Sequence, residues 1–291
     1  MLAEKAVASK KRFSRVKAVI NSTFLIIIVL GLWTFWIEPS SLTVNRTTLQ
    51  ISHWPAQFNQ FKIVAISDLH VGAPYVSLEK LKRIVEMANA EQPDLIVLLG
   101  DYVIQDVVGG NFIAPEDFAP ELGRLKAKHG VYAVLGNHDW WLEGPRIKRS
   151  FEGAGVRVLS NEAVRIAEGE TGFWLAGIDD FWSRHHNISK TLNQITTKEP
   201  IIALNHSPDI FPELPDQISL TLCGHTHGGQ VNIPWLRTKV LPSRYGDRFL
   251  AGHIEEDGKH LFVTKGIGTS GLPARFLAAP EIAVLTVIAS E

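Results

Sequence analysis

The pattern of apolar and polar positions divides the chain into an N-terminal apolar stretch and a longer alternating region. Residues 18–37 contain no charged side chain and centre on the run Phe24-Leu-Ile-Ile-Ile-Val-Leu30. As a helix, these 20 residues span about 30 Å, close to the thickness of the hydrocarbon core of a bilayer. Trp33 and Trp36 near its C-terminal end suit a membrane–water interface. We therefore predict a transmembrane anchor over residues 18–37.

Basic residues precede this stretch. Residues 1–17 hold six basic side chains and one acidic one, which leaves 23 basic and 29 acidic residues in the remainder, a net charge of −6. By the positive-inside rule, we expect residues 1–17 in the cytoplasm and the main domain on the outer or periplasmic side of the cell (inner) membrane. A cleaved signal peptide has a similar start, but Glu38-Pro39-Ser40-Ser41 offers no small-x-small cleavage motif, so an uncleaved single-pass anchor is favoured.

Beyond Pro39 the pattern alternates between strand-like and helix-like segments joined by short connections. Strand-length apolar runs occur at 62–67, 94–99, 131–135, 173–178, 201–204, 219–223, 249–254, 260–264 and 281–288. Helical segments are expected at 78–88, with Ser77 as N-cap, and at about 116–128, 144–154 and 186–196. Because no repeat or long linker divides residues 40–291, we predict one α/β domain whose sheets are covered by helices.

Composition and charge limit the function classes. Apolar residues make up 45% of the 291 residues, which is enough for a substantial core. The single cysteine, Cys223, excludes an internal disulfide and a multi-thiolate zinc site. A net-acidic body disfavours general nucleic-acid binding, which relies on Lys and Arg contacts to phosphate, so no nucleic-acid partner is expected.

Side chains of metal-ligand type follow the predicted strands. They occur in the segments Asp68-Leu-His70, Gly100-Asp101, Gly136-Asn137-His138-Asp139, Asn205-His206 and Gly224-His225-Thr226-His227. Strand-end loops converge at one edge of an open α/β sheet. In an extended segment, residues i and i+2 also point the same way, which would direct Asp68 and His70 to one small volume, and likewise His225 and His227. Glycines before these motifs would let the backbone approach a crowded centre closely.

This set combines carboxylate, imidazole and amide oxygen. Such ligands suit Mn²⁺, Fe or Zn²⁺ rather than Ca²⁺ or a thiolate site. Seven such ligands exceed what one ion takes from a protein. They suffice for two ions about 3.5–4 Å apart, bridged by one carboxylate. We therefore predict a site for two divalent metal ions.

The ordered motifs resemble the calcineurin-like metallophosphoesterase superfamily over residues 62–227. Gly266-Ile-Gly-Thr-Ser270 and Pro280-Glu281 are similar to a membrane-anchored bacterial branch of it. The resemblance implies a four-layer αββα sandwich, in which two mixed β-sheets pack between helices. It also implies a first metal held by Asp68, His70, Asp101 and His227, and a second held by Asp101 (the bridge), Asn137, His206 and His225.

The resemblance further implies an activity. His138 would be the catalytic group that donates a proton to the leaving oxygen or stabilises the phosphoryl group. A metal-bridging hydroxide would cleave a phosphodiester or pyrophosphate bond without a covalent phospho-enzyme. Related anchored enzymes act on lipid or nucleotide–lipid substrates such as UDP-2,3-diacylglucosamine. That conjugate is cytoplasmic, which conflicts with an outward-facing domain.

Several alternatives stay open at this point. A phosphomonoesterase, a phosphoprotein phosphatase and a non-catalytic, membrane-tethered binding module compete with the phosphodiesterase, and the oligomeric state is open. Trp140, Trp141 and Phe181-Trp182 either accommodate acyl chains or belong to the ordinary core and rim. Asp139 either holds the His138 imidazole protonated or stabilises a turn. Arg275 either approaches the substrate or forms a surface salt bridge.

Overall fold

The computed structural model describes residues 2–290, together with the side chains of residues 13–238 and 241–290. Of the six basic side chains in residues 1–17, the structure describes those of Arg15 and Lys17, and the other four lie outside the described residues.

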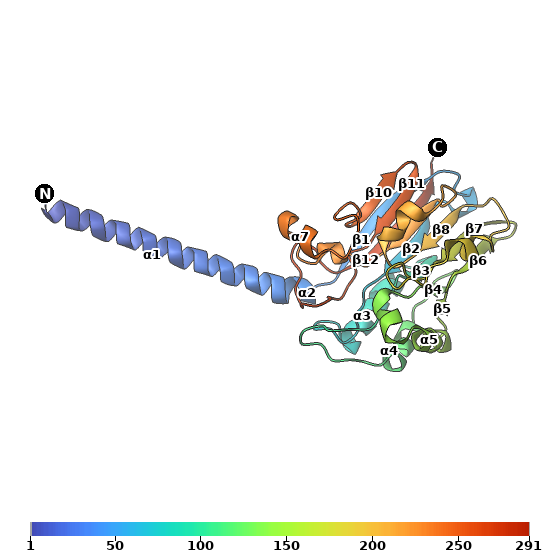
Figure 1. The fold of residues 1–291 in the computed structure, drawn as a ribbon, viewed down its shortest axis with the longest axis horizontal. Coiled ribbons are helices and arrows are strands. Elements are labelled where there is room, and N and C mark those ends of the chain that lie inside the picture. The colour runs from blue at the N-terminus through green and yellow to red at the C-terminus, as the bar shows by residue number, and fades with distance from the viewer. Residues whose placement is uncertain (1, 291) are drawn as a thin grey trace.

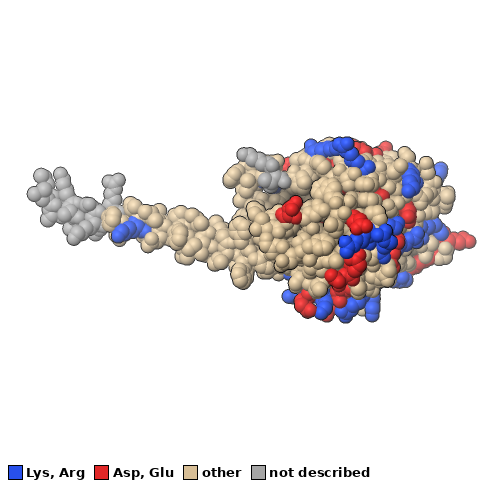
Figure 2. Space-filling model, turned by 60° about the horizontal axis from the view of Figure 1, so that its bottom comes forward, with Lys and Arg blue, Asp and Glu red and all other residues tan. Residues whose placement is uncertain are grey.

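A long helix precedes the domain and projects away from it (Figure 1). Helix α1 (Leu2–Leu32) continues into a π-helical turn (Trp33–Ile37) and the short helix α2 (Glu38–Ser40). Within this N-terminal helix, Phe13–Ser40 is a candidate membrane span of 28 residues, and its most apolar 18 residues have a mean hydropathy of 2.1 and are not buried against the domain. Most of the described helix carries no Lys, Arg, Asp or Glu, and the adjoining end of the domain is also mostly uncharged (Figure 2). The helix is long and apolar enough to cross a bilayer, and the anchor over residues 18–37 stays a prediction.

The domain contains two six-stranded mixed sheets that pack face to face, with helices on their outer faces (Figure 1). The first sheet has the order β1 (Thr43–Ile51), β12 (Glu281–Ala289), β2 (Phe61–Ile66), β3 (Leu95–Leu98), β4 (Val131–Ala133) and β5 (Arg157–Val158). The second has the order β10 (Gly252–Glu256), β11 (Lys259–Val263), β9 (Leu220–Cys223), β8 (Ile201–Leu204), β7 (Thr171–Gly177) and β6 (Glu162–Glu168). The pairings among β2, β3, β4 and β5 and among β7, β8, β9 and β11 are parallel.

Successive side chains of a strand point to opposite faces of the sheet, so a strand such as β2 contributes to two apolar layers. In β2, Ile63 and Ala65 face the layer between the sheets, whereas Val64 and Ile66 face the helices. The outer face of the first sheet is covered by α3 (Leu78–Ala90), α4 (Pro115–Leu122) and α5 (Asn137–Gly153). The outer face of the second carries α6 (Ile188–Leu192) and a 3₁₀ segment (Pro208–Glu213). This confirms the four-layer αββα arrangement and the α/β class.

The structure differs from the expectation at three strands (β1, β5 and β6), at helix α7 (Pro234–Val240) and at several helix ends; α4 ends at Leu122 instead of about residue 128, and α6 ends at Leu192 instead of about residue 196. Strands β1 and β6 were not predicted, because both alternate between exposed and partly buried positions and carry many polar residues. Helix α5 begins at Asn137 instead of about residue 144, and Glu143 interrupts it with a non-helical conformation. The motif that looked like a loop therefore forms the first turn of a helix.

Direct hydrogen bonds join the N-terminal helix to the domain. The buried Glu38 carboxylate accepts from Trp33 Nε1 at 2.6 Å and from the backbone N–H of Ala278 at 2.6 Å. The backbone N–H of Arg275 donates to Thr34 O at 2.9 Å. Lys80 Nζ on α3 donates to the carbonyl oxygens of Ser40 and Ser41. Because these bonds reach two separate parts of the domain, the helix leaves it in a defined direction.

An aromatic cluster closes one end of the layer between the sheets. Phe173 contacts Trp54, Phe58 and Phe61, with ring centroids 5.0–5.3 Å apart. Phe173 is fully buried, so its removal leaves a cavity that its neighbours fill only in part.

We expect Phe173→Ala to lower the free energy of unfolding by about 3–5 kcal/mol, measured by urea denaturation followed by tryptophan fluorescence. The control is Phe112→Ala, because this side chain is 51% exposed, and we expect a change within about 0.5 kcal/mol. Equal losses in the two variants would contradict the role of the cluster.

Candidate metal centre

The motif residues follow the carboxyl ends of five parallel strands, in loops or, for Asn137, in the first turn of α5. Strands β2, β3 and β4 of the first sheet end just before Asp68, Asp101 and Asn137. Strands β8 and β9 of the second sheet end just before His206 and His225. The two packed sheets deliver these carboxyl ends to one shared edge, as expected from the strand pattern.

The structure brings the predicted ligands together in two groups. Asp68, His70 and His227 form one group, in which the candidate ligand atoms lie within 4.8 Å of one another. Asp101, His206 and His225 form the second under the same criterion. All six residues are buried.

Asp101 lies between the two groups. Its Oδ2 is 3.1 Å from His206 Nε2 in one group and 3.7 Å from His70 Nε2 in the other. Its Oδ1 accepts the backbone N–H of His138 at 2.9 Å. A single carboxylate in this position suits a ligand shared by two ions.

The spacing of the ring nitrogens fits bound cations. His70 Nε2 and His227 Nε2 are 3.3 Å apart, and His206 Nε2 and His225 Nδ1 are 3.1 Å apart. Two nitrogens that each lie about 2.1 Å from one ion, at roughly 90–110°, are separated by about 3.0–3.4 Å. In addition, the buried Asn137 Oδ1 has no hydrogen-bond partner among the described side chains and backbone. The donor set therefore fits divalent ions at the two groups. Asn137 lines the cavity beside them, and its place on the second ion stays a prediction.

Backbone carbonyls orient two of the imidazoles. His70 Nδ1 lies 3.1 Å from Val103 O, and His206 Nδ1 lies 2.7 Å from Leu99 O. Because a carbonyl only accepts, Nδ1 carries the hydrogen in each ring and Nε2 is the atom directed toward the other ligands.

Burial and the neighbouring charges set the protonation of the site. Burial alone would raise the pKa of Asp101, but His206 and His138 hold it well below its usual value. Burial acts to lower the pKa of His206, yet the Asp101 and Asp68 carboxylates raise it to about 10. Burial lowers the pKa of His70 to about 4 and that of His225 to about 3. Of these three histidines, only His206 carries a charge at neutral pH in the metal-free protein.

The local backbone of the ligands differs from the expectation. We expected extended segments with residues i and i+2 side by side, but φ is positive at Asp68 (53°), His70 (43°), Asp101 (56°), His225 (71°) and His227 (51°). Non-glycine residues adopt this left-handed conformation at a cost of about 1–3 kcal/mol each. The residues thus converge for a different reason, namely that the surrounding contacts hold strained loops in place.

Asp139 stabilises two of these loops. Its Oδ2 accepts the backbone N–H groups of Asp101 and Gly136, both at 2.8 Å. Its Oδ1 accepts those of Tyr102 and Val103 at 2.9 and 3.3 Å. Of the two interpretations of Asp139, the turn-stabilising one is confirmed.

Two glycines allow the close approach of these loops. A Cβ atom at Gly136 would collide with Asp101 Oδ1, and one at Gly224 would collide with Ser67 Oγ. The prediction that glycines before the motifs permit a crowded centre is confirmed at both positions.

His138 lies at a cavity of about 240 Å³ that opens onto the ligand groups. Its Nε2 is 3.9 Å from Asp101 Oδ2, and its ring lies against His70 and Trp141. Trp141 and Trp182 also line this cavity. By contrast, Trp140 stacks on His185 at 3.9 Å and Phe181 is buried in the core, so the core interpretation holds for Phe181, and a contact of Trp141 and Trp182 with acyl chains stays a prediction.

Arg275 is neither at the substrate cavity nor in a surface salt bridge, so both interpretations were wrong. Its side chain is fully buried and donates to the carbonyl oxygens of Gly268, Ala278 and Lys265. Nη2 also lies 3.4 Å from His227 Nδ1. Arg275 therefore cross-links the loop at residues 266–278 beneath the first ligand group, through contacts that no sequence spacing indicates.

Comparisons with known proteins agree with this geometry. Residues 61–229 match the family model described as calcineurin-like phosphoesterase. The chain is 32% identical to the uncharacterised metallophosphoesterase YkuE of Bacillus subtilis, over 86% of this chain and 87% of that protein. It is 32% identical to the phosphodiesterase YaeI of Escherichia coli, over 78% of this chain and 82% of that protein. A transmembrane protein with a metallophosphoesterase domain from Danio rerio is 32% identical over 96% of this chain and 64% of its own length.

The raised pKa of His206 generates a prediction for metal binding. An ion at the second group must displace the Nε2 proton, so its affinity should rise about tenfold per pH unit between about pH 6.5 and 8.5. Calorimetric Mn²⁺ titrations in buffers of different ionisation heat should show one proton released with that ion. The first group is the internal control, because the pKa values of His70 and His227 lie below this range. Affinities independent of pH at both groups would contradict the assignment.

Proposed function

Since the chain belongs to the calcineurin-like phosphoesterase family, we propose that it hydrolyses phosphodiester or pyrophosphate bonds at a dinuclear metal centre. The protein is a metallophosphoesterase, and its family uses divalent metals. The observation that carries the proposal is the pair of buried ligand groups with Asp101 between them.

The residues divide between two ions. Asp68, His70 and His227 would hold the first ion together with Asp101, and Asp101, Asn137, His206 and His225 would hold the second. Divalent ions such as Mn²⁺, Fe or Zn²⁺ bound there supply positive charge that polarises the phosphoryl group and lowers the pKa of a water. Burial and the carbonyl contacts of the imidazoles keep these ligands preorganised.

The cavity beside the ligands receives the phosphate ester. His138 at its wall supplies the proton for the leaving oxygen, since it lies next to Asp101 without belonging to either ligand group. Trp182 lines the same cavity and would contact the bound ester. A diester is favoured over a monoester because one relative at 32% identity is named a phosphodiesterase.

The N-terminal helix and the transmembrane relative associate the protein with a membrane. We propose that the helix is a single-pass anchor, with residues 1–17 in the cytoplasm and the domain at residues 40–291 on the outer side. A lipid or nucleotide–lipid diester in the same membrane is the proposed substrate class.

Removing the shared carboxylate tests the dinuclear centre. With full-length protein in detergent and Mn²⁺, we expect wild type to hydrolyse bis(4-nitrophenyl) phosphate faster than 4-nitrophenyl phosphate. Asp101→Asn should lower diester turnover by at least about 100-fold, because both ions lose a ligand. The matched control is Asp106→Asn, an exposed residue close in the chain, which should leave turnover unchanged. A wild type that binds two ions and remains inert, or an active Asp101→Asn variant, would contradict the proposal.

Replacing His138 tests proton donation separately from metal binding. His138→Ala should lower kcat by about 10²–10⁴ while the metal content by mass spectrometry stays at two ions. His253→Ala, on the exposed β10–β11 hairpin, is the control and should behave as wild type. Unchanged turnover with unchanged metal would exclude the proposed role of His138.

A further inference from the structure

A second cavity lies beside the metal centre and differs from it in character. Its volume is about 480 Å³, within the range of small-molecule sites. Its walls are mainly aliphatic, with Val231, Leu236, Leu241 and Leu272 facing the space from two segments of the chain. We call this space the α7 pocket, after the helix α7 (Pro234–Val240). Among the side chains that the structure describes, which exclude residues 239 and 240, His227 is the only titratable one in its lining. Such a lining favours an apolar ligand group.

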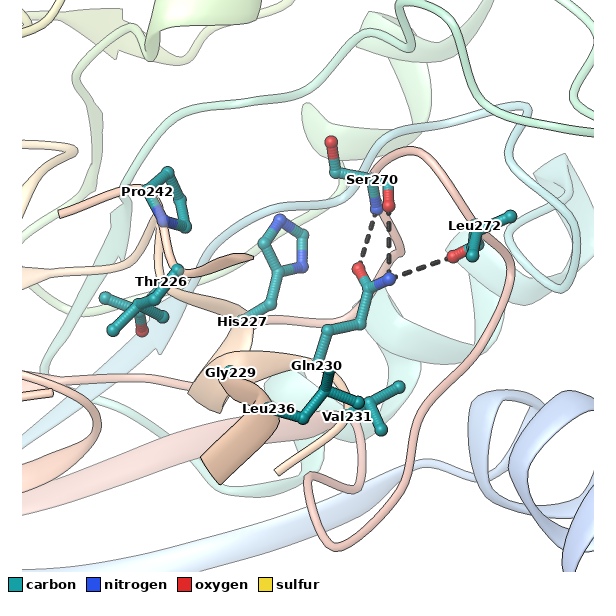
Figure 3. A pocket seen from close by; sticks show the side chains of 10 residues that line it. Thr226, His227, Gly229, Gln230, Val231, Leu236, Pro242, Ser270 and Leu272 are labelled. Carbon is teal, nitrogen blue, oxygen red and sulfur yellow. Dashed lines mark hydrogen bonds between the residues drawn. The ribbon is translucent and has the colours of Figure 1, made fainter. Parts of the chain in front are cut away.

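Hydrogen bonds hold the two walls of the pocket together (Figure 3). The Gln230 side chain donates to the carbonyl oxygens of Ser270 and Leu272, at 3.1 and 2.9 Å, and accepts the N–H of Ser270 at 2.9 Å. Next to it, the backbone of Phe276 pairs with Gln230 and Asn232. The pocket is therefore preformed, which reduces the ordering cost of binding a ligand.

The α7 pocket adjoins the cavity of the metal centre. His227, Pro242 and Ser270 line both spaces. His227 also belongs to the first ligand group. One molecule can thus place a phosphate at the ligands and an attached apolar group in the α7 pocket.

The outer side of the pocket lies at the end of the domain next to the N-terminal helix. Helix α7 is on this side of the domain (Figure 1). The pocket segments carry three large exposed apolar side chains: Trp235 (70%), Leu272 (57%) and Leu277 (65%). In the sequence, Arg275 lies between Leu272 and Leu277. Its backbone N–H donates a hydrogen bond to the carbonyl oxygen of Thr34, which belongs to the apolar stretch at residues 18–37. Thr34 is three residues before Ile37, about 5 Å along the helix, so this loop lies at the level of the last turn of that stretch.

From this placement we propose that the α7 pocket binds an acyl chain of a membrane lipid whose phosphodiester lies at the metal centre. The proposal rests on the proposed function and specifies its substrate as a lipid phosphodiester in the bilayer that holds the N-terminal helix. Trp235, Leu272 and Leu277 contact the bilayer surface, and the chain enters the pocket past Leu272.

Chain-length preference tests the pocket. Full-length protein in lipid nanodiscs with Mn²⁺ would be assayed on ethyl and octyl 4-nitrophenyl phosphate, which differ by six methylene groups. We expect kcat/KM to be at least about tenfold higher for the octyl ester, because the added methylenes leave water. Equal values for the two esters would overturn the proposal.

Two matched leucine variants test whether the preference for the octyl ester depends on the α7 pocket. Leu272→Asn should lower kcat/KM for the octyl ester about tenfold and leave the ethyl ester unchanged, because Leu272 lines the pocket. Leu277→Asn is the control, because this exposed leucine of the same loop contacts the bilayer surface but does not line the pocket, so it should change the values for the two esters by the same factor. Equal losses on both esters in Leu272→Asn would overturn the proposal.

A readout independent of turnover separates this inference from the proposed function. Vesicles would contain phosphatidylcholine with a diazirine in its acyl chain, and adducts would be mapped by mass spectrometry. We expect adducts on residues 231–241 in addition to the N-terminal helix, and fewer of them in Leu272→Asn. Adducts confined to the N-terminal helix would overturn the pocket assignment. If neither ester is cleaved but pocket adducts form, the proposed function fails while the lipid site stands.

Discussion

The metal centre depends on four backbone N–H groups that the buried Asp139 carboxylate accepts. These groups belong to Asp101, Tyr102, Val103 and Gly136, so one side chain holds the loops after β3 and β4 against each other. The left-handed backbone at Asp101 is tolerated only while this contact persists. Since Asp101 lies between both ligand groups, its position is set by a neighbour that belongs to neither group.

Arg275 has the corresponding role on the other side of the site. Its buried guanidinium donates to the carbonyl oxygens of Lys265, Gly268 and Ala278, at the start, in the interior and at the end of the segment 265–278. Gly266 and Gly268 of that loop pack directly on Asp68 and His70. The buried Glu281 fixes the start of the loop by accepting from Thr264 Oγ1 and the N–H of Lys265. The same loop forms a wall of the α7 pocket, so the ligand groups and the pocket share one support.

The sequence predicts the architecture and the grouping of the ligands better than their local conformation. Strands such as β2 and β3 are apolar throughout because both of their faces are covered, and this pattern is visible without a structure. Strand β1 escapes prediction because polar and exposed side chains such as Arg46 and Gln50 interrupt it. The positive φ values at Asp68 and His70 arise from tertiary contacts, against the local preference of those residues. The burial of Arg275 likewise depends on carbonyls that only the folded chain brings together.

The hydrogen bonds of Glu38 and Thr34 fix the N-terminal helix to the domain, and this affects how the protein meets its substrate. A flexible linker would let the domain sweep through the solution above the membrane, whereas these hydrogen bonds keep the catalytic cavity at one height relative to the helix end. For an anchored protein, the search for substrate then becomes two-dimensional. Encounter would depend on the surface density of a lipid and its lateral diffusion, and a bilayer a short distance away would be out of reach.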